Sequence, residues 1–254
     1  IQNIALLVAL AVGLQALTHQ LGDRRWIYRA TAGLLFGLAG LAVMMTPVHF
    51  APGVIYDGRS IVLSLAGLFG GGVPALVAAF MCGAYRLHLG GAGVWAGLSV
   101  IVEAAALGVA LHHLRKRDER WVSPLRLLVF GVVVHSIMLG LQLLIPKGVG
   151  WEVLRNFGLP ILLFYPVAFL LAAHVFLEGE RRRAAVLALA QSEERYRSLF
   201  ENNHAVMLII DPAEGQIVDA NPAACAFYGW TRDELRQKRI GEINILTSDQ
   251  VQRE

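Results

Sequence analysis

The sequence predicts a mainly α-helical fold: a polytopic membrane bundle of about seven apolar segments, one short and broken, followed by a smaller α+β module. Of the 254 residues, 56% are hydrophobic and 16% are charged, whereas soluble domains carry about 25% charged residues. The mean hydropathy is +0.55. Several runs without Asp, Glu, Lys or Arg reach the roughly 20 residues that cross a bilayer. From Glu178 onward the composition becomes charged and globular, which predicts the second module.

The third apolar segment is too short to cross a membrane at about 1.5 Å per residue. It ends in Gly70-Gly71-Gly72, followed by Pro74, and glycines followed by proline break a helix. Residues 59–89 are therefore predicted to form a short helix, a tight turn and a fuller helix. The predicted apolar segments are approximately 3–20, 29–46, 59–70, 73–89, 93–114, 124–145 and 157–178.

Basic residues are distributed unevenly between the predicted span ends. If every segment crosses and the C-terminal part is cytoplasmic, eleven Arg and Lys residues lie inside and four lie outside. This positive-inside bias predicts a multi-pass protein of the bacterial inner membrane with its N-terminus outside. It also accounts for the net charge of +3, so we exclude nucleic acid as a partner and expect the lipid bilayer instead. We read the first segment as a retained span and expect the true N-terminus to precede Ile1.

Arg59 and Arg86 are each flanked by long uncharged runs, and both fall toward the predicted outer side. The antiparallel arrangement of 59–70 and 73–89 would bring these two residues together. Each guanidinium presents a planar fork of donors that suits a carboxylate or a phosphate. The pair therefore predicts a site for a small-molecule ligand, with a small carboxylate as the preferred class. The alternative is that both side chains extend to the lipid headgroups.

Further polar residues are candidates for the same ligand site. Asp57 either braces Arg59 or contacts the ligand. Glu103 and His135 lie in mid-span, where ionisable groups are costly and face the bundle interior, so they belong either to the ligand site or to a buried structural hydrogen bond. The candidates besides the two arginines are Asp57, Tyr85, Ser60, Ser99, Glu103 and His135.

No pattern in the sequence predicts catalysis or metal binding. Cys82 and Cys225 occur in different contexts, and the adjacent His112 and His113 do not share a helix face. No nucleophile–base pair, phosphate loop, kinase motif or cyclase motif is present. We therefore predict no catalytic residue, no metal ion and no cofactor in this chain.

A charged helix is predicted over residues 179–200, between the last span and the second module. Five residues, all but one of them apolar or aromatic, recur in it at spacings of three and four, which predicts either a seam for a parallel homodimer or an ordinary amphipathic helix. The seam residues are Val186, Leu189, Glu193, Tyr196 and Phe200.

Local signals after this helix predict a compact α+β fold. A strand over 205–211 and a second over 217–218 flank a turn, Asn221-Pro222 starts a helix, and Thr231 with Glu234 has capping-box spacing. This string resembles the PAS domain family over about 55 residues, which implies a domain over 193–254. Since that family continues with a helix and three strands, we expect its fold to be incomplete at Glu254.

The membrane part resembles the LytS-type five-transmembrane sensor family over about 28–178, within a predicted sensor domain of 1–178. The resemblance rests on four motifs, which are Asp57-Gly58-Arg59-Ser60, Ala66-Gly67-Leu68-Phe69-Gly70-Gly71, Tyr85-Arg86 and Gly90-Gly91-Ala92-Gly93. The family often has Asn-x-Arg at the first motif, and Gly-Gly-Pro where this chain has Gly70-Gly71-Gly72-Val73-Pro74. The resemblance implies a receptor that signals to a histidine kinase or a diguanylate cyclase outside this chain. The alternatives are a transporter-like substrate-binding subunit and a passive anchor for a sensing PAS domain.

Overall fold

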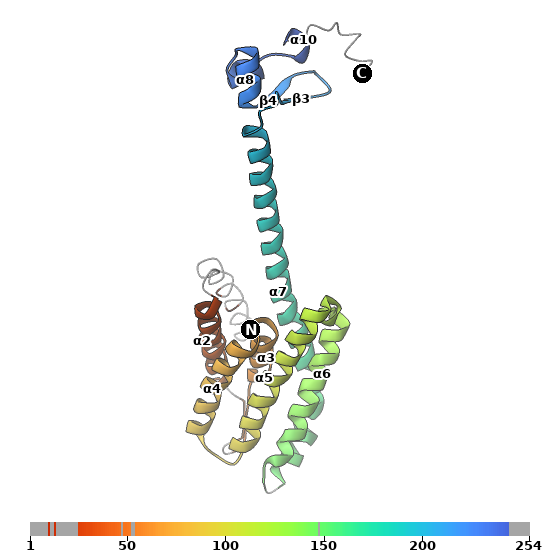
Figure 1. The fold of residues 1–254 in the computed structure, drawn as a ribbon. Helices are drawn as coiled ribbons and strands as arrows, with labels where there is room; N and C mark the ends of the chain where they lie inside the picture. Colours follow the sequence, from red (N-terminus) through yellow and green to blue (C-terminus); the bar gives the residue numbers. More distant parts are fainter. Residues whose placement is uncertain are drawn as a thin grey trace. The chain divides into compact units, whose positions relative to one another are not determined.

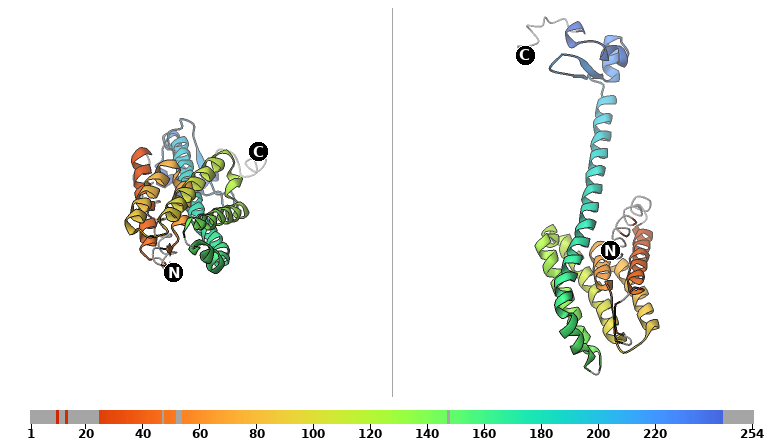
Figure 2. Two further views of the ribbon diagram at one scale, coloured as in Figure 1. Left: turned by 90° about the horizontal axis from the view of Figure 1, so that it is seen from below. Right: turned by 180° about the vertical axis from the view of Figure 1, so that it is seen from behind.

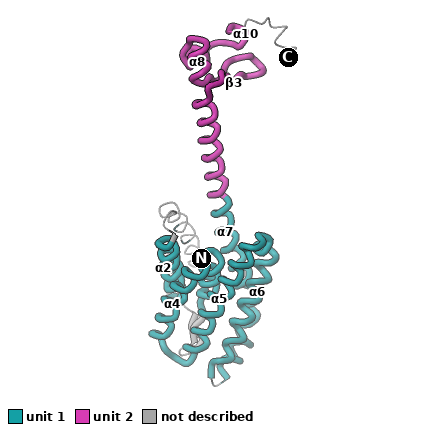
Figure 3. Tube along the Cα trace, viewed as in Figure 1, with its two compact units in different colours: residues 1–181 teal, residues 182–254 magenta. Residues whose placement is uncertain are grey.

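The computed structural model describes Leu10, Gly13 and residues 25–46, 48–51, 54–146 and 148–243. The contacts divide the chain into two compact units, residues 1–181 and residues 182–254, which are coloured separately in Figure 3. The predicted first span at 3–20 lies outside the described residues apart from Leu10 and Gly13.

The first unit is a helical bundle, and its long helices run alongside one another (Figures 1 and 2). The described part contains five helices that are long and apolar enough to cross a membrane, which makes this a multi-pass membrane protein. The mainly α-helical class predicted from the sequence is confirmed. The elements of the unit are α2 (Arg25–Met44), β1 (Val48–Ala51), β2 (Val54–Tyr56), α3 (Arg59–Leu65), the π-helical turn η1 (Ala66–Gly70), α4 (Gly72–Leu89), α5 (Val94–Arg117), η2 (Glu119–Val122), α6 (Pro124–Leu141), η3 (Gln142–Leu144) and the first part of α7 (Val149–Glu201).

The helix is interrupted between η1 and α4, as the glycine run predicts. Gly71 has φ 77°, a left-handed conformation that favours glycine. Its amide donates to the carbonyl of Gly67, which ends the π-helical turn. All seven residues of α3 are buried, so this short helix lies inside the bundle. The sequence did not predict the antiparallel hairpin β1–β2 that precedes it.

The bundle core is built mainly from α2, α3, α4, α5 and α7. Phe36 stacks on Phe176 at 6.0 Å, and Phe69 stacks on the same ring at 4.9 Å between centroids. The outward faces carry large exposed apolar side chains such as Leu76, Phe80 and Leu159. An apolar outer surface is the one that lipid requires.

Helix α7 is continuous over 53 residues and includes Pro160 and Pro166. The last predicted span and the predicted charged helix at 179–200 are therefore one helix. On the seam, Val186, Leu189 and Tyr196 are 60%, 70% and 53% exposed.

The second unit has a small antiparallel sheet followed by short helices. Its strand β3 is shorter than the predicted 205–211, and β4 is longer than the predicted 217–218. Asn221 caps α8 by accepting from the amide of Ala224, and the capping box of Thr231 with Glu234 opens α9. The elements after α7 are β3 (Leu208–Ile210), β4 (Ile217–Ala220), α8 (Pro222–Tyr228), α9 (Arg232–Arg236) and α10 (Ile240–Ile243).

An ion-pair network joins the end of α7 to this sheet. Arg232 donates two parallel hydrogen bonds to Asp219, at 2.6 and 2.7 Å, and a third to Glu201 at 2.8 Å. Its guanidinium also lies 5.9 Å from the centre of the Phe200 ring. Phe200, a predicted seam residue, is only 3% exposed within the chain itself.

Candidate functional site

The site begins where α3 begins. The Oδ1 atom of Asp57 accepts a hydrogen bond from the backbone amide of Arg59 at 3.0 Å and lies 2.9 Å from Nε of the same residue. The Asp57 side chain is fully buried, and the Arg59 side chain is 7% exposed. This brace is one of the two roles predicted for Asp57 from the sequence.

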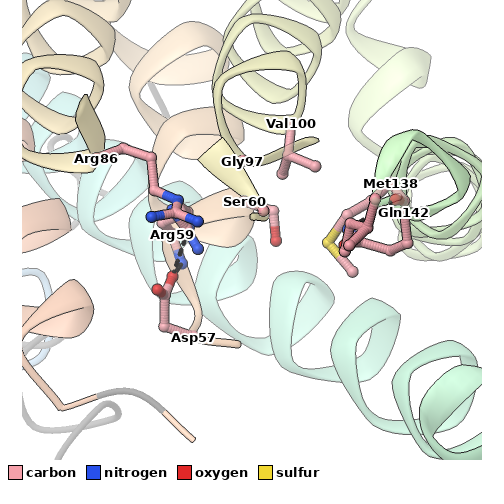
Figure 4. Close-up of a pocket in the computed structure, with 10 residues that line it drawn as sticks. Asp57, Arg59, Ser60, Arg86, Gly97, Val100, Met138 and Gln142 are labelled. Atoms are coloured by element: carbon pink, nitrogen blue, oxygen red, sulfur yellow. Dashed lines mark hydrogen bonds and ion pairs between the residues drawn. The ribbon is translucent and has the colours of Figure 1, made fainter. Parts of the chain in front are cut away.

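Arg86 reaches the same place from the last turn of α4. It is 2% exposed, and its Nη1 donates to the carbonyl of Gly90 at 2.8 Å. Figure 4 shows the guanidinium groups of Arg86 and Arg59 close together beside Asp57. Because both arginines are buried, neither extends to the lipid headgroups, which removes that alternative.

Both guanidiniums line one cavity of about 30 Å³. Such a volume holds a water molecule or a very small group without movement of the walls. Two cations and one carboxylate leave the walls with a positive balance, and α5 and α6 supply the remaining side. The cavity is lined by Asp57, Arg59, Ser60, Arg86, Gly93, Gly97, Val100, Met138, Gln142 and Ile145.

Ser60 connects this cavity to His135. The hydroxyl of Ser60 lies 3.2 Å from Nε2 of His135, and Nδ1 of the ring lies 2.7 Å from the carbonyl of Gly131. A carbonyl can only accept, so Nδ1 carries a proton and, in the neutral ring, Nε2 accepts from the Ser60 hydroxyl. His135 is fully buried and packs edge-on against Tyr165 at 5.2 Å. It therefore supports the cavity wall without lining it.

Three predicted site residues lie elsewhere. Tyr85 is partly buried and packs against the bundle core. Ser99 donates to the carbonyl of Trp95 at 2.9 Å, and it lines an open groove of about 520 Å³ together with Glu103. The carboxylate oxygens of Glu103 are buried and accept no hydrogen bond from any described residue.

The helical period explains this separation on α5. Gly93, Gly97 and Val100 are spaced by four and three residues and share the face that meets the cavity. Ser99 and Glu103 are spaced by four on a different face.

The wall residues contributed by α5, α6 and η3 are not among the site residues predicted from the sequence. Gln142 had a usable signal, because it is an amide at the end of a long apolar run. It is 7% exposed, and its Nε2 donates to the carbonyl of Met138 at 3.1 Å. Glycines and apolar residues such as Val100 carry no such signal. Among the described residues, no group of three His, Cys, Asp or Glu could hold a metal ion.

Comparisons with known proteins match both parts of the chain. The family model described as "5TMR of 5TMR-LYT" matches residues 12–178, and a PAS domain model matches residues 194–253. The diguanylate cyclase DgcM of Escherichia coli (strain K12) is 52% identical over 52 residues, which are 20% of this chain and 13% of that protein. The protein of the same name from Escherichia coli O157:H7 matches to the same extent. This chain thus aligns with a small part of the curated relatives' length, and no solved structure gives a significant match.

Proposed function

The chain belongs to the 5TMR of 5TMR-LYT family, and from this premise we propose that it is the receptor part of a bacterial membrane signalling protein whose bundle binds a small carboxylate. The observation that carries the proposal is that Arg59 and Arg86, both buried, line one cavity. Burying two guanidiniums is costly unless charge and hydrogen bonds compensate them. Asp57 pairs with Arg59, and an anionic ligand in the cavity would lie against both arginines.

The chemistry of the walls favours a planar anion with few atoms. A guanidinium binds a carboxylate through a fork of parallel donors, and both arginines line the cavity. The volume of about 30 Å³ favours small acids, and binding of a 2-oxo acid would require the walls to move apart. Such movement is how ligand binding would become a signal, since a ligand shifts an equilibrium only through its different affinities for two states.

The proposed direction of signalling is supported by the basic residues and the PAS domain. The positive-inside bias supports a cavity that opens toward the periplasm of the inner membrane and a cytoplasmic PAS domain. The 52-residue relationship to a diguanylate cyclase supports an output enzyme of that class over a histidine kinase.

A homodimer through α7 and the PAS domain is part of this proposal. Val186, Leu189 and Tyr196 leave an exposed apolar seam, which a second copy would cover. Phe200 would not contribute, because it is buried within its own chain.

Calorimetry on the full chain in lipid nanodiscs tests the ligand site, with pyruvate, acetate and inorganic phosphate as titrants. We expect one of the carboxylates to bind, and Arg59→Ala and Arg86→Ala to abolish the binding. Arg86→Lys, which keeps the charge but loses the fork, should bind more weakly than the unmodified chain. Arg155→Ala is the matched control, since Arg155 is an exposed arginine of α7. Unchanged affinity in both alanine variants, or no binding of any titrant, would reject the site.

A further inference from the structure

The cavity lies at the first turn of α3. The helix α3 and its π-helical turn η1 form one segment from Arg59 to Gly70, which we call the rod, and the far end of the rod reaches α7. From Arg59 to Gly70, α3 and its π-helical turn cover roughly 15 Å. At the cavity end the rod carries Arg59 and Ser60. At the far end it carries Phe69, whose ring stacks on Phe176 of α7 at 4.9 Å between centroids.

The rod is held against α5 by backbone contact. A β-carbon on Gly67 would lie 2.5 Å from the backbone nitrogen of Val109, and 2.7 Å from the α-carbon of Gly108. The Ser64 hydroxyl donates to the carbonyl of Ala104 at 3.3 Å. Such close packing resists bending, so α3 can move only as one piece or together with α5.

The π-helical turn has its own partner on α5. Nδ1 of His112 lies 2.7 Å from the carbonyl of Leu68, and only a donor can bind that oxygen. Single π-helical turns are uncommon and occur frequently at functional sites. Phe69 lies within this turn, next to Leu68.

Arg115 contacts both the π-helical turn and α7. It forms an ion pair with Glu180 of α7, and its guanidinium lies 5.4 Å from the centre of the Phe69 ring. Phe69 thus contacts α7 through Phe176 directly and through Arg115 and Glu180 indirectly. Helix α7 then continues without a break to Glu201.

We infer that α3 and its π-helical turn carry a change in the arginine cavity to α7, through the Phe69–Phe176 stack and the Arg115–Glu180 ion pair. Phe69, Arg115, Phe176 and Glu180 are positioning residues in this inference, since none of them lines the cavity. This inference rests on the proposed function only for the nature of the signal, which is the binding of a ligand. The connection between α3 and α7 can be tested without any ligand.

The ligand-independent test perturbs the cavity end and measures α7. Asp57→Asn weakens the brace on Arg59, and hydrogen–deuterium exchange of peptides covering residues 172–190 reports on α7 in nanodiscs. We expect Asp57→Asn to change this exchange by about 2- to 30-fold, the range found for coupled residues. In a Phe69→Leu background the change should be largely lost, because leucine keeps apolar volume but removes the stack on Phe176.

Two further variants sharpen the test. Phe80→Leu is the control, since Phe80 is 76% exposed on α4, and it should leave the response to Asp57→Asn intact. Arg115→Glu should abolish the response, and combining it with Glu180→Arg should restore part of it. An equal response in the Phe69→Leu and unmodified backgrounds, or no response of α7 to Asp57→Asn, would overturn the inference.

Calorimetry separates this inference from the proposed function. If pyruvate binds the Phe69→Leu variant normally but no longer alters hydrogen exchange in α7, the result supports both the ligand site and the connection from α3 to α7. If neither carboxylate binds the unmodified chain, the proposed function fails, and the comparison of Asp57→Asn in the two backgrounds still decides whether α3 is connected to α7.

Discussion

The guanidinium of Arg86 lies against Gly97 of the neighbouring helix, so closely that a β-carbon on Gly97 would be 2.5 Å from Nε of Arg86. The position therefore requires glycine for as long as Arg86 stays in place. Arg86 comes from α4 and Gly97 from α5, so their contact sets one wall of the cavity.

Gly97→Ala should displace Arg86 and weaken binding of the carboxylate that the unmodified chain binds. Overpacking costs about 1–3 kcal/mol, and if the whole of this cost appeared as lost affinity it would correspond to about 5- to 150-fold. Calorimetry measures the change. The control is Gly83→Ala on α4, where the new β-carbon would meet Leu98 at an ordinary 3.7 Å. Equal affinity in the Gly97→Ala and unmodified chains would mean that Arg86 does not contact the ligand.

Two glycines five residues apart should differ sharply in their tolerance of a methyl group. Gly67→Ala places a β-carbon 2.5 Å from the backbone of α5, which cannot move aside as a flexible side chain can, whereas Gly72 has nothing within 4 Å. We expect Gly67→Ala to destabilise the bundle by about 1–3 kcal/mol or more, and Gly72→Ala to have little effect. Thermal unfolding in detergent compares them, and similar midpoints would show that α3 does not pack on α5 this closely.

Asn221 satisfies every hydrogen-bonding position of its side-chain amide. Its oxygen accepts from the amides of Met207 and Ala224 at 3.0 and 2.9 Å, and its nitrogen donates to the carbonyls of Asn203 and Ala205 at 3.2 and 2.8 Å. Asn221→Ala should therefore destabilise the second unit, since each unsatisfied buried group costs about 1–3 kcal/mol.

Asn221→Asp should also destabilise this unit, because a carboxylate oxygen would then face two carbonyls. Hydrogen exchange over residues 205–236 measures both variants, with the exposed Asn202→Ala as the control. Exchange that stays slow in Asn221→Asp would show that the two donated bonds contribute nothing.

The ion pair of Asp219 with Arg232 should make the second unit sensitive to acid. Hydrogen bonds from Arg232 hold the pKa of Asp219 below its ordinary value of 3.8, and the same contact raises the pKa of Arg232. A lowered pKa in the folded state means that the carboxylate stabilises this unit fully above about 3.8, and that this contribution is lost as the pH falls through the lower folded value.

Arg232→Lys should raise the pKa of Asp219 toward 3.8, because lysine cannot donate two parallel bonds. The carboxyl carbon-13 shift of Asp219 follows the titration. Arg236→Lys should have a smaller effect, since Nε of Arg236 lies 3.5 Å from Asp219. A larger shift in Arg236→Lys than in Arg232→Lys would contradict this assignment.

The sequence alone predicted the structural features that depend on residues close together in the chain. Charge-free runs predict spans because lipid excludes charge, and the glycines at 70–72 predict the break between η1 and α4. Both family resemblances are confirmed by the matches to residues 12–178 and 194–253. The caps at Asn221 and Thr231 form as predicted, because each involves atoms only a few residues apart.

Tertiary structure alone decided which side chains share the cavity. Ser60, Gly97 and Gln142 come from α3, α5 and η3, and their meeting depends on how those helices are rotated about their axes. A helix turns by about 100° per residue, so Val100 lines the cavity while its neighbour Ser99 faces the groove. The hydropathy of a segment determines that it crosses the membrane as a helix. The rotation of that helix about its axis is set by packing against its neighbours, and these contacts cannot be read from a single sequence.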